Sequence, residues 1–379
     1  MKQVKRSRAW AGPLLGMLGG IGLVLAIAAG VPARAQEGLE VRVYLPLGLR
    51  ANGGPFVART AQPATATPSP TPEPTEPPEP SATPEPTDPP SPTPTPTQSL
   101  PPWQARVHYH RALANLPGVT VNPDWDRGGA LHAKYMVKTD HVAHDEQTNS
   151  PWYTPEGREA AQLGNIYVFS RPDKTAADAV DGWMTAPFHQ IAVLDPELQV
   201  SGYGDYGEAV GTWQFGATLS VLRGRPGVAD GVRFPIRYPE DGRTLPFLSF
   251  NGNESPDPLP SCLGYTAPTG PPLVLMLGAG DVTPNVRSTM LAEVGGGQLP
   301  VCSFDETNFK HSNSGQRDLG RAILNSRDAI IVLPKSPLKA GTEYRVTIVN
   351  GGDTHSWTFR TAGRAELVDV DPDGRALLR

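Results

Sequence analysis

Apolar residues recur at helical spacing in three stretches of the middle of the chain, at about residues 103–113, 124–138 and 174–186. In each stretch they lie three or four positions apart, which places them on one face of a helix. A shorter helix is expected over residues 158–163, where it leads directly into the apolar run 165–169. We therefore expect three main helices and one short helix here.

The ends of these helices carry characteristic residues. Pro117-Gly118 follows the first helix and Pro187 follows the third, and proline cannot continue a helix. We expect Asp124 to cap the second helix, and Asp173 or Thr175 to cap the third.

After the third helix, β-branched and aromatic residues occur in short runs at residues 198–206 and 209–222. Such runs predict strands of an antiparallel sheet. Helices that flank an antiparallel sheet make an α+β sandwich, which we expect over residues 103–222.

Turn residues dominate the region 223–364, where Gly, Pro, Asn and Asp separate short apolar runs. Short strands at such spacing predict an all-β domain. Near its end, apolar residues alternate over residues 344–348 and again over residues 357–359. A β-hairpin is therefore expected there, with Gly351-Gly352 in its turn.

The chain starts with the features of an exported protein. Residues 1–35 combine a basic start, an apolar core and Ala33-Arg34-Ala35 before Gln36, which is the pattern of a cleaved signal peptide. The apolar core is long for a signal peptide, so an uncleaved membrane anchor is the alternative. No later run in the sequence is long enough to span a bilayer.

Two segments separate this signal from the first helix. Residues 36–59 form a short apolar segment that contains the strand-like VRVYLPLGLR, and residues 60–102 form a linker rich in Pro and Thr. The linker has almost no large apolar side chains, so we expect it to be disordered and extended, and a candidate for O-glycosylation. It is expected to hold the globular part away from the N-terminus. The tail 365–379 is acidic, and its DVDPDG only partly matches a calcium loop.

The charge balance excludes one class of partner. Lys and Arg total 33 against 38 Asp and Glu, which gives a net charge of −5. A chain this acidic, without a basic block in its globular part, has little with which to neutralise phosphates. Nucleic acid is therefore not an expected partner.

Cys262 and Cys302 are the only cysteines of the chain. In an exported protein, an isolated pair of cysteines predicts one disulfide. The alternative is two free buried thiols.

Histidines and acids gather in a part of the chain that could carry chemistry. His132 lies beside the apolar stripe of the second helix, and His189 comes just after the third. Between them, residues 141–146 read HVAHDE, which matches no closed zinc pattern such as H-E-x-x-H. On the residues alone, a packed core histidine and a solvated polar loop are favoured over a ligand-binding role.

Several segments of residues 103–222 together resemble the CAP superfamily (cysteine-rich secretory, antigen 5 and pathogenesis-related proteins) in its bacterial form. They are LHAKYM, HDE followed by YTPEG, GNI, and GWMTAPFHQIAVLDP followed by GYG. The resemblance implies an α-β-α sandwich with a cleft, which two histidines and two glutamates line in many members. His132 and His189 match the two histidines, and Asn165 belongs to the GNI segment.

The two acids are missing from their family positions. Gly164 stands where the first glutamate is expected, and no acid follows Trp183 where the second is expected. Glu146 or Glu159 could substitute for one of them. The loop with His144 and Glu146 is expected at the mouth of the cleft.

The missing acids weaken the case for a metal and for catalysis. Zn²⁺ held by His132 and His189 is the candidate metal, although two imidazoles usually need a third ligand. Ser170 and Ser201 stand in no triad pattern, and no G-x-S-x-G motif occurs. We therefore assign no catalytic residue and do not expect an enzyme.

A second resemblance concerns the end of the region 223–364. Residues 331–361 resemble the closing hairpin of bacterial Ig-like modules. The resemblance implies an Ig-like β-sandwich for this region.

Three functions are compatible with these features. The first is a secreted, non-enzymatic protein that binds a protein, lipid or envelope partner at or outside the cell envelope. The second is a metal-assisted hydrolase, either a peptidase or a cell-wall-active enzyme, suggested by the histidine pair beside an acidic loop. The third is a lipid or sterol binder, for which no apolar cavity-lining stretch is visible. We favour the first, because the cleft histidines lack their family acids.

Overall fold

The structure is a computed structural model of the chain, and it describes residues 41–44 and 99–363. The predicted signal peptide, most of the segment 36–59, nearly all of the linker and the tail 365–379 lie outside the described residues. Among the described helices, none is long and apolar enough to cross a membrane.

A five-stranded sheet forms the centre of the first region. Its strands lie in the order β5 (Tyr203–Gly207), β6 (Phe215–Ser220), β3 (Gly164–Phe169), β1 (Val41–Tyr44) and β9 (Glu254–Ser255). All neighbours are antiparallel except β1 and β9. The sheet therefore joins strands from three distant parts of the sequence.

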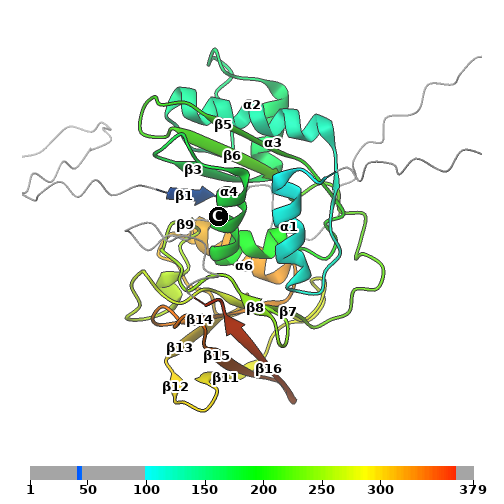
Figure 1. Ribbon diagram of the computed structural model, residues 1–379, viewed down its shortest axis with the longest axis vertical. Helices are drawn as coiled ribbons and strands as arrows, with labels where there is room; N and C mark the ends of the chain where they lie inside the picture. The colour runs from blue at the N-terminus through cyan, green and yellow to red at the C-terminus, as the bar shows by residue number, and fades with distance from the viewer. Residues whose placement is uncertain (1–40, 45–98, 364–379) are drawn as a thin grey trace, which may run out of the picture. The chain divides into compact units, whose positions relative to one another are not determined.

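Helices cover both faces of this sheet (Figure 1). They are α1 (Pro102–Ala112), α2 (Pro123–Thr139), α3 (Pro155–Leu163), α4 (Ala176–Thr185) and α5 (Pro187–Val193). Alternate residues of β3 face opposite layers, because successive side chains of a strand point to opposite faces. Ile166 packs with Met136 of α2, whereas Tyr167 packs edge-on against Trp183 of α4. This layered arrangement of helices and antiparallel strands is the α+β sandwich predicted for the region.

One close backbone approach lets α2 lie on the sheet. A Cβ atom at Gly204 of β5 would lie 2.0 Å from the backbone nitrogen of Ala130. Only glycine fits at this position, so the YGDYG strand can pack directly under the helix that carries His132.

Two of the predicted helix boundaries differ from the structure. Asn122 caps α2 in place of Asp124, because its side chain accepts the N–H of residue 124 and Pro123 takes the first helical position. Thr175 caps α4, as one of the two alternatives predicted, in a capping box with Asp178. Pro187 begins the next helix, so His189 lies within α5 rather than in a loop.

The region after residue 222 contains two further sheets. The first has the order β13 (Val301–Phe304), β14 (Ala329–Pro334), β10 (Leu273–Met276) and β7 (Ile236–Tyr238). The second has the order β12 (Gln298–Leu299), β11 (Val286–Glu293), β15 (Glu343–Asn350), β16 (Asp353–Thr361) and β8 (Thr244–Leu245). A two-stranded pair, β2 (Thr120–Val121) and β4 (Val200–Ser201), lies in the first region.

The predicted hairpin is confirmed as β15 and β16, which pair from Glu343–Arg360 to Asn350–Asp353. The expectation of an all-β region is wrong, because it also contains α6 (Ser314–Asn325) and the short 3₁₀ helix η1 (Leu259–Ser261). Asn313 caps α6, and Ile323 and Leu324 bury its apolar face. The resemblance to an Ig-like module stays a prediction.

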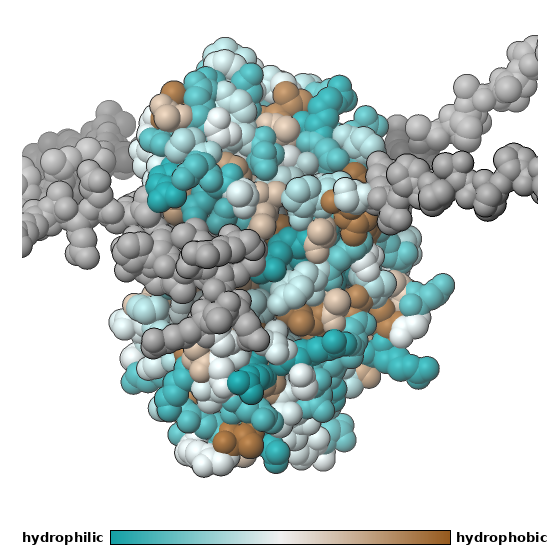
Figure 2. All heavy atoms as spheres, in the orientation of Figure 1, coloured by the Kyte–Doolittle hydropathy of each residue, from teal (hydrophilic) through white to brown (hydrophobic). Residues whose placement is uncertain are grey.

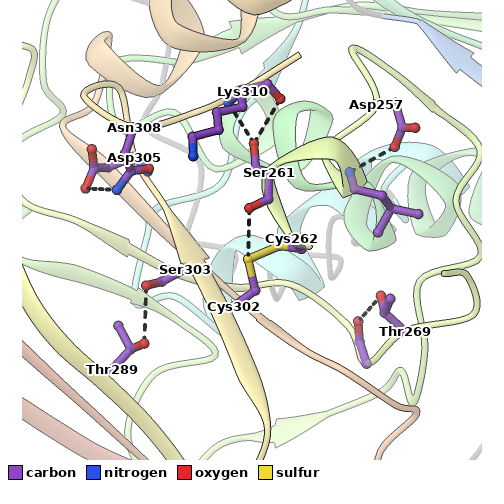
Figure 3. The surroundings of a disulfide bond; sticks show 12 residues. Asp257, Ser261, Cys262, Thr269, Thr289, Cys302, Ser303, Asp305, Asn308 and Lys310 are labelled. Carbon is purple, nitrogen blue, oxygen red and sulfur yellow. Dashed lines mark hydrogen bonds between the residues drawn. A yellow bond between two sulfur atoms is a disulfide. The ribbon is translucent and has the colours of Figure 1, made fainter. Parts of the chain in front are cut away.

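The predicted disulfide is confirmed between Cys262 and Cys302, with 5.6 Å between their Cα atoms. It joins the segment after η1 to β13 (Figure 3). Beside it, the Ser261 hydroxyl accepts the N–H of Lys310 at 2.8 Å and donates to its carbonyl at 3.0 Å. Closing a loop of 40 residues stabilises the fold by about 4 kcal/mol in the chain-entropy model.

The hydrophobic core runs without interruption through both regions. The same cluster of buried residues contains Trp103 and Trp183 from the first region and Phe304 and Phe359 from the second. Phe188 of α5 lies 5.0 Å from Phe309, measured between ring centroids. The described residues, 41–44 and 99–363, belong to one compact unit.

Buried charges also join the two regions. Asp195 is 2% exposed and accepts hydrogen bonds from Arg327 at 2.6 Å on both of its oxygens. Arg225 donates to Asp195 at 2.8 Å, and Arg327 lies 3.0 Å from Glu197. Arg111, fully buried, donates to the carbonyls of four residues of neighbouring segments: Pro117, Val193, Asp195 and Leu198.

A second buried network links α1, α4 and β7. The imidazole of His110 contacts Asp181 through Nε2 at 2.8 Å and the Tyr238 hydroxyl through Nδ1 at 2.9 Å. Arg106 holds the same carboxylate with two hydrogen bonds of 2.6 and 3.0 Å. Burial lowers the pKa of His110, although the hydrogen bond to Asp181 acts in the opposite direction.

This pKa predicts that His110 destabilises the fold in mild acid. Below about pH 6.5 the unfolded chain protonates this histidine more readily than the folded chain, so stability is lost as the pH falls. We expect the free energy of unfolding to fall less steeply between about pH 7 and pH 5 in His110→Gln than in the wild type, by at most about 1.4 kcal/mol per pH unit. Urea unfolding at each pH measures the slope, with exposed His141→Gln as the control. Equal slopes for wild type and His110→Gln would contradict this prediction.

Candidate functional site

The first candidate histidine forms a buried pair with an acid. His132 lies on α2, and its Nδ1 is 3.0 Å from Oε1 of Glu146, with both side chains 0% exposed. The other oxygen of Glu146 accepts the N–H of Thr154 at 2.9 Å, just where α3 begins. Tyr135 stacks on the imidazole with 5.9 Å between the rings. The acid and the aromatic ring therefore fix the orientation of His132.

The second candidate histidine forms a pair of the same kind. Nδ1 of His189 lies 2.8 Å from Oε1 of Glu254, and both side chains are again 0% exposed. The same oxygen accepts the backbone N–H groups of Phe188 at 2.7 Å and of His189 at 3.0 Å. Burial raises the pKa of Glu254 well above its ordinary value, while the two backbone hydrogen bonds act to lower it.

Asn165 and Gly164 lie at the start of β3, and Asn165 contacts the second pair. The side-chain amide of Asn165 donates to the carbonyl of His189 at 3.3 Å. A Cβ atom at Gly164 would lie 2.7 Å from the carbonyl oxygen of Leu219 and 2.8 Å from that of Ala160. The close approach of these backbones leaves no room for the glutamate that the resemblance places at residue 164.

In the loop after α2, some side chains are buried and others face the solvent. His144 is buried, and its Nδ1 lies 2.6 Å from the carbonyl oxygen of Ala161 in α3. Asp145 turns outward and pairs with Arg158 at 2.5 Å, and His141 is exposed. Of this loop, Glu146 thus reaches a candidate histidine, whereas Asp145 belongs to the surface.

Glu159 does not take the place of a missing acid. It is exposed and pairs with Arg223 at 3.1 Å, so Glu146 is the substitute that the structure brings to His132.

Glu254 is the site residue that the sequence did not reveal. It stands in the turn-rich stretch NGNES, far along the chain from both histidines. Its contact with His189 spans 65 residues. The sequence offered one indirect indication: the two glutamates of the family are missing from their positions, so an acid from elsewhere in the chain could take their place.

The described residues set limits on metal and nucleophile chemistry. Within residues 41–44 and 99–363, no group of three or more His, Cys, Asp and Glu side chains is arranged to hold a metal ion. Nε2 of His132 is buried and has no hydrogen-bond partner among the described residues. Ser201 donates its hydroxyl to the carbonyl of Ser220, which is not a base. The geometry thus fits ligand binding by the imidazoles better than nucleophilic attack by a serine.

Comparison with known proteins identifies one family. The model of the CAP family, described as the cysteine-rich secretory protein family, matches residues 104–213. No curated protein matches the chain.

Proposed function

Because residues 104–213 form a CAP domain, we propose that the protein is an extracellular, non-enzymatic binding protein whose ligand contacts His132 and His189. We call these two residues with their acids Glu146 and Glu254 the two-histidine site. The family and the disulfide fit an oxidising environment outside the cytosol.

The buried Nε2 atom of His132 is the observation that carries the proposal. Buried polar atoms nearly always have a hydrogen-bond partner, yet this one has none among the described residues. Nδ1 of the same ring is held by Glu146. An imidazole oriented by a carboxylate is the usual arrangement of a histidine that binds a metal ion or a small ligand through its second nitrogen.

The ligand class favoured by these donors is a divalent metal ion that accepts imidazole nitrogen, such as Zn²⁺, or a small polar molecule with a hydrogen-bond donor. On the face seen in Figure 2, brown residues form small separate groups among polar ones. A lipid carrier would call for a continuous apolar surface or cavity.

The test is titration of the full chain with Zn²⁺ by calorimetry. We expect binding at micromolar concentration or tighter, and at least a tenfold loss of affinity in His132→Ala/His189→Ala. Exposed His141→Ala in the neighbouring loop serves as the matched control and should bind like the wild type. Equal binding by wild type and double variant would contradict the proposed site. Turnover of peptide, ester or glycan libraries that is lost on chelation would contradict the non-enzymatic function.

A further inference from the structure

We propose that Glu254 is the positioning residue of His189, so that the region after residue 222 completes the two-histidine site of the CAP domain. This inference deepens the proposed function, because it names the group that orients one of the two ligand-binding histidines. It also assigns the C-terminal region a part in the site rather than a separate role.

The two histidine–acid pairs have the same geometry. In each, Nδ1 of the imidazole contacts Oε1 of a glutamate, at 3.0 Å for His132 and 2.8 Å for His189. All four side chains are fully buried. The acid of the first pair comes from the adjacent loop, 14 residues away, whereas the acid of the second comes from the chain after residue 222, 65 residues away.

The surroundings of Glu254 determine the direction of its hydrogen bond to the imidazole. Its Oε1 already accepts two backbone N–H groups, from Phe188 and His189. Backbone N–H groups can only donate, so this oxygen acts as an acceptor and Nδ1 is the nitrogen that carries hydrogen. The lone pair of the His189 imidazole is then on Nε2, as in His132.

The chain holds Glu254 in place on both sides. Within the central sheet, Glu254 of β9 pairs in parallel register with Val43 of β1. A few residues later, Asp257 accepts the N–H of Leu259 at the start of η1, and Cys262 then anchors the segment to β13 through the disulfide. An acid fixed in this way can hold an imidazole in one orientation.

A role in capping α5 does not account for this glutamate. Two backbone N–H groups need only an acceptor oxygen, which Asn, Ser or Thr supplies at most helix starts. Burial of a carboxyl group is costly unless its interactions compensate. The contact with Nδ1 distinguishes Glu254 from an ordinary capping residue.

The first experiment determines the tautomer of His189 by ¹⁵N NMR of the imidazole in the full chain, without any ligand. We expect hydrogen on Nδ1 in the wild type and loss of this preference in Glu254→Ala. Glu254→Gln should keep it, because the amide oxygen still accepts all three N–H groups. Exposed Glu159→Ala is the matched control and should leave the tautomer unchanged. Hydrogen on Nε2 in the wild type, or the same tautomer in Glu254→Ala, would overturn the proposal.

The second experiment uses Zn²⁺ alone as the probe. Loss of a carboxylate behind a ligating histidine typically weakens metal binding about 10–100-fold, which we expect for Glu254→Ala and for the matched Glu146→Ala. Glu254→Gln should fold and weaken binding less than Glu254→Ala, because the amide oxygen still accepts hydrogen from Nδ1. In a His189→Ala background, Glu254→Gln should have no further effect, and an equal loss in both backgrounds would refute positioning. If the wild type does not bind Zn²⁺, the proposed metal fails, and the tautomer alone decides the role of Glu254.

Discussion

A fragment of residues 39–222 is expected not to fold as an independent domain, although it contains the whole segment matched by the CAP family. The larger of the two hydrophobic clusters spans both regions, so the fragment would expose apolar side chains that the full chain buries. Phe188 alone would lose its contacts with Phe304 and Phe309. Exposure of one such side chain costs about 1.5–3 kcal/mol, and a whole domain has only about 5–15 kcal/mol of stability.

The fragment would also lose the partners of its polar groups. Asp195 would lack Arg327, His110 would lack Tyr238, and the first turn of α5 would lack Glu254. We expect poor dispersion in amide NMR spectra and no cooperative thermal transition. A second fragment of residues 39–363 keeps all these contacts and should melt like the full chain. A cooperative transition of fragment 39–222 close to that of the full chain would contradict a shared core.

Removal of Arg327 is expected to cost about 3–5 kcal/mol, the usual result of breaking a buried ion pair by deleting one partner. Arg327 is 4% exposed and binds both oxygens of Asp195, which then keeps only Arg225 as an ionic partner among the described residues. The remaining carboxylate stays largely out of water with only Arg225 to compensate its charge.

Urea unfolding of Arg327→Ala measures this cost. Arg317→Ala is the matched control, since it removes an exposed pair with Asp318 that contributes at most about 1 kcal/mol. Arg327→Lys keeps the charge but not the planar fork, so we expect an intermediate loss. A loss below about 1 kcal/mol for Arg327→Ala would show that the network is not needed for stability.

Local sequence patterns were sufficient to predict the helices and strands that form from residues close together in the sequence. The stripe of apolar residues in α2 and the alternation in β15 and β16 gave the right element types, because each periodicity reflects one buried face. The disulfide was predictable because the chain has a single pair of cysteines. His132 and His189 were found as candidates through the family resemblance.

Contacts between residues far apart in the sequence could not be predicted from such local patterns. Glu254 reaches His189 across 65 residues, and nothing in NGNES indicates that its acid is buried. The same holds for β1, whose partners are fixed only when β3 and β9 come together. Helix α6 was missed because its amphipathic pattern lies in a stretch of turns and short strands.

The pairing of β1 with β3 and β9 determines where the chain that contains the Pro/Thr-rich segment begins. β1 and α1 belong to the same compact unit, so the chain between them starts and ends on one folded body. The expectation that this segment acts as a spacer before the globular part stays a prediction.

The pairing of β1 with β3 and β9 can be treated as the intramolecular binding of a strand to a sheet, with the chain between β1 and α1 as the linker. Because the entropy of loop closure grows slowly with length, doubling the chain between β1 and α1 would cost only about 0.6 kcal/mol. The length of this segment can thus vary with little effect on the fold. A single cut in it would make the pairing bimolecular, and any other strand able to pair with β3 would then compete for the vacant edge.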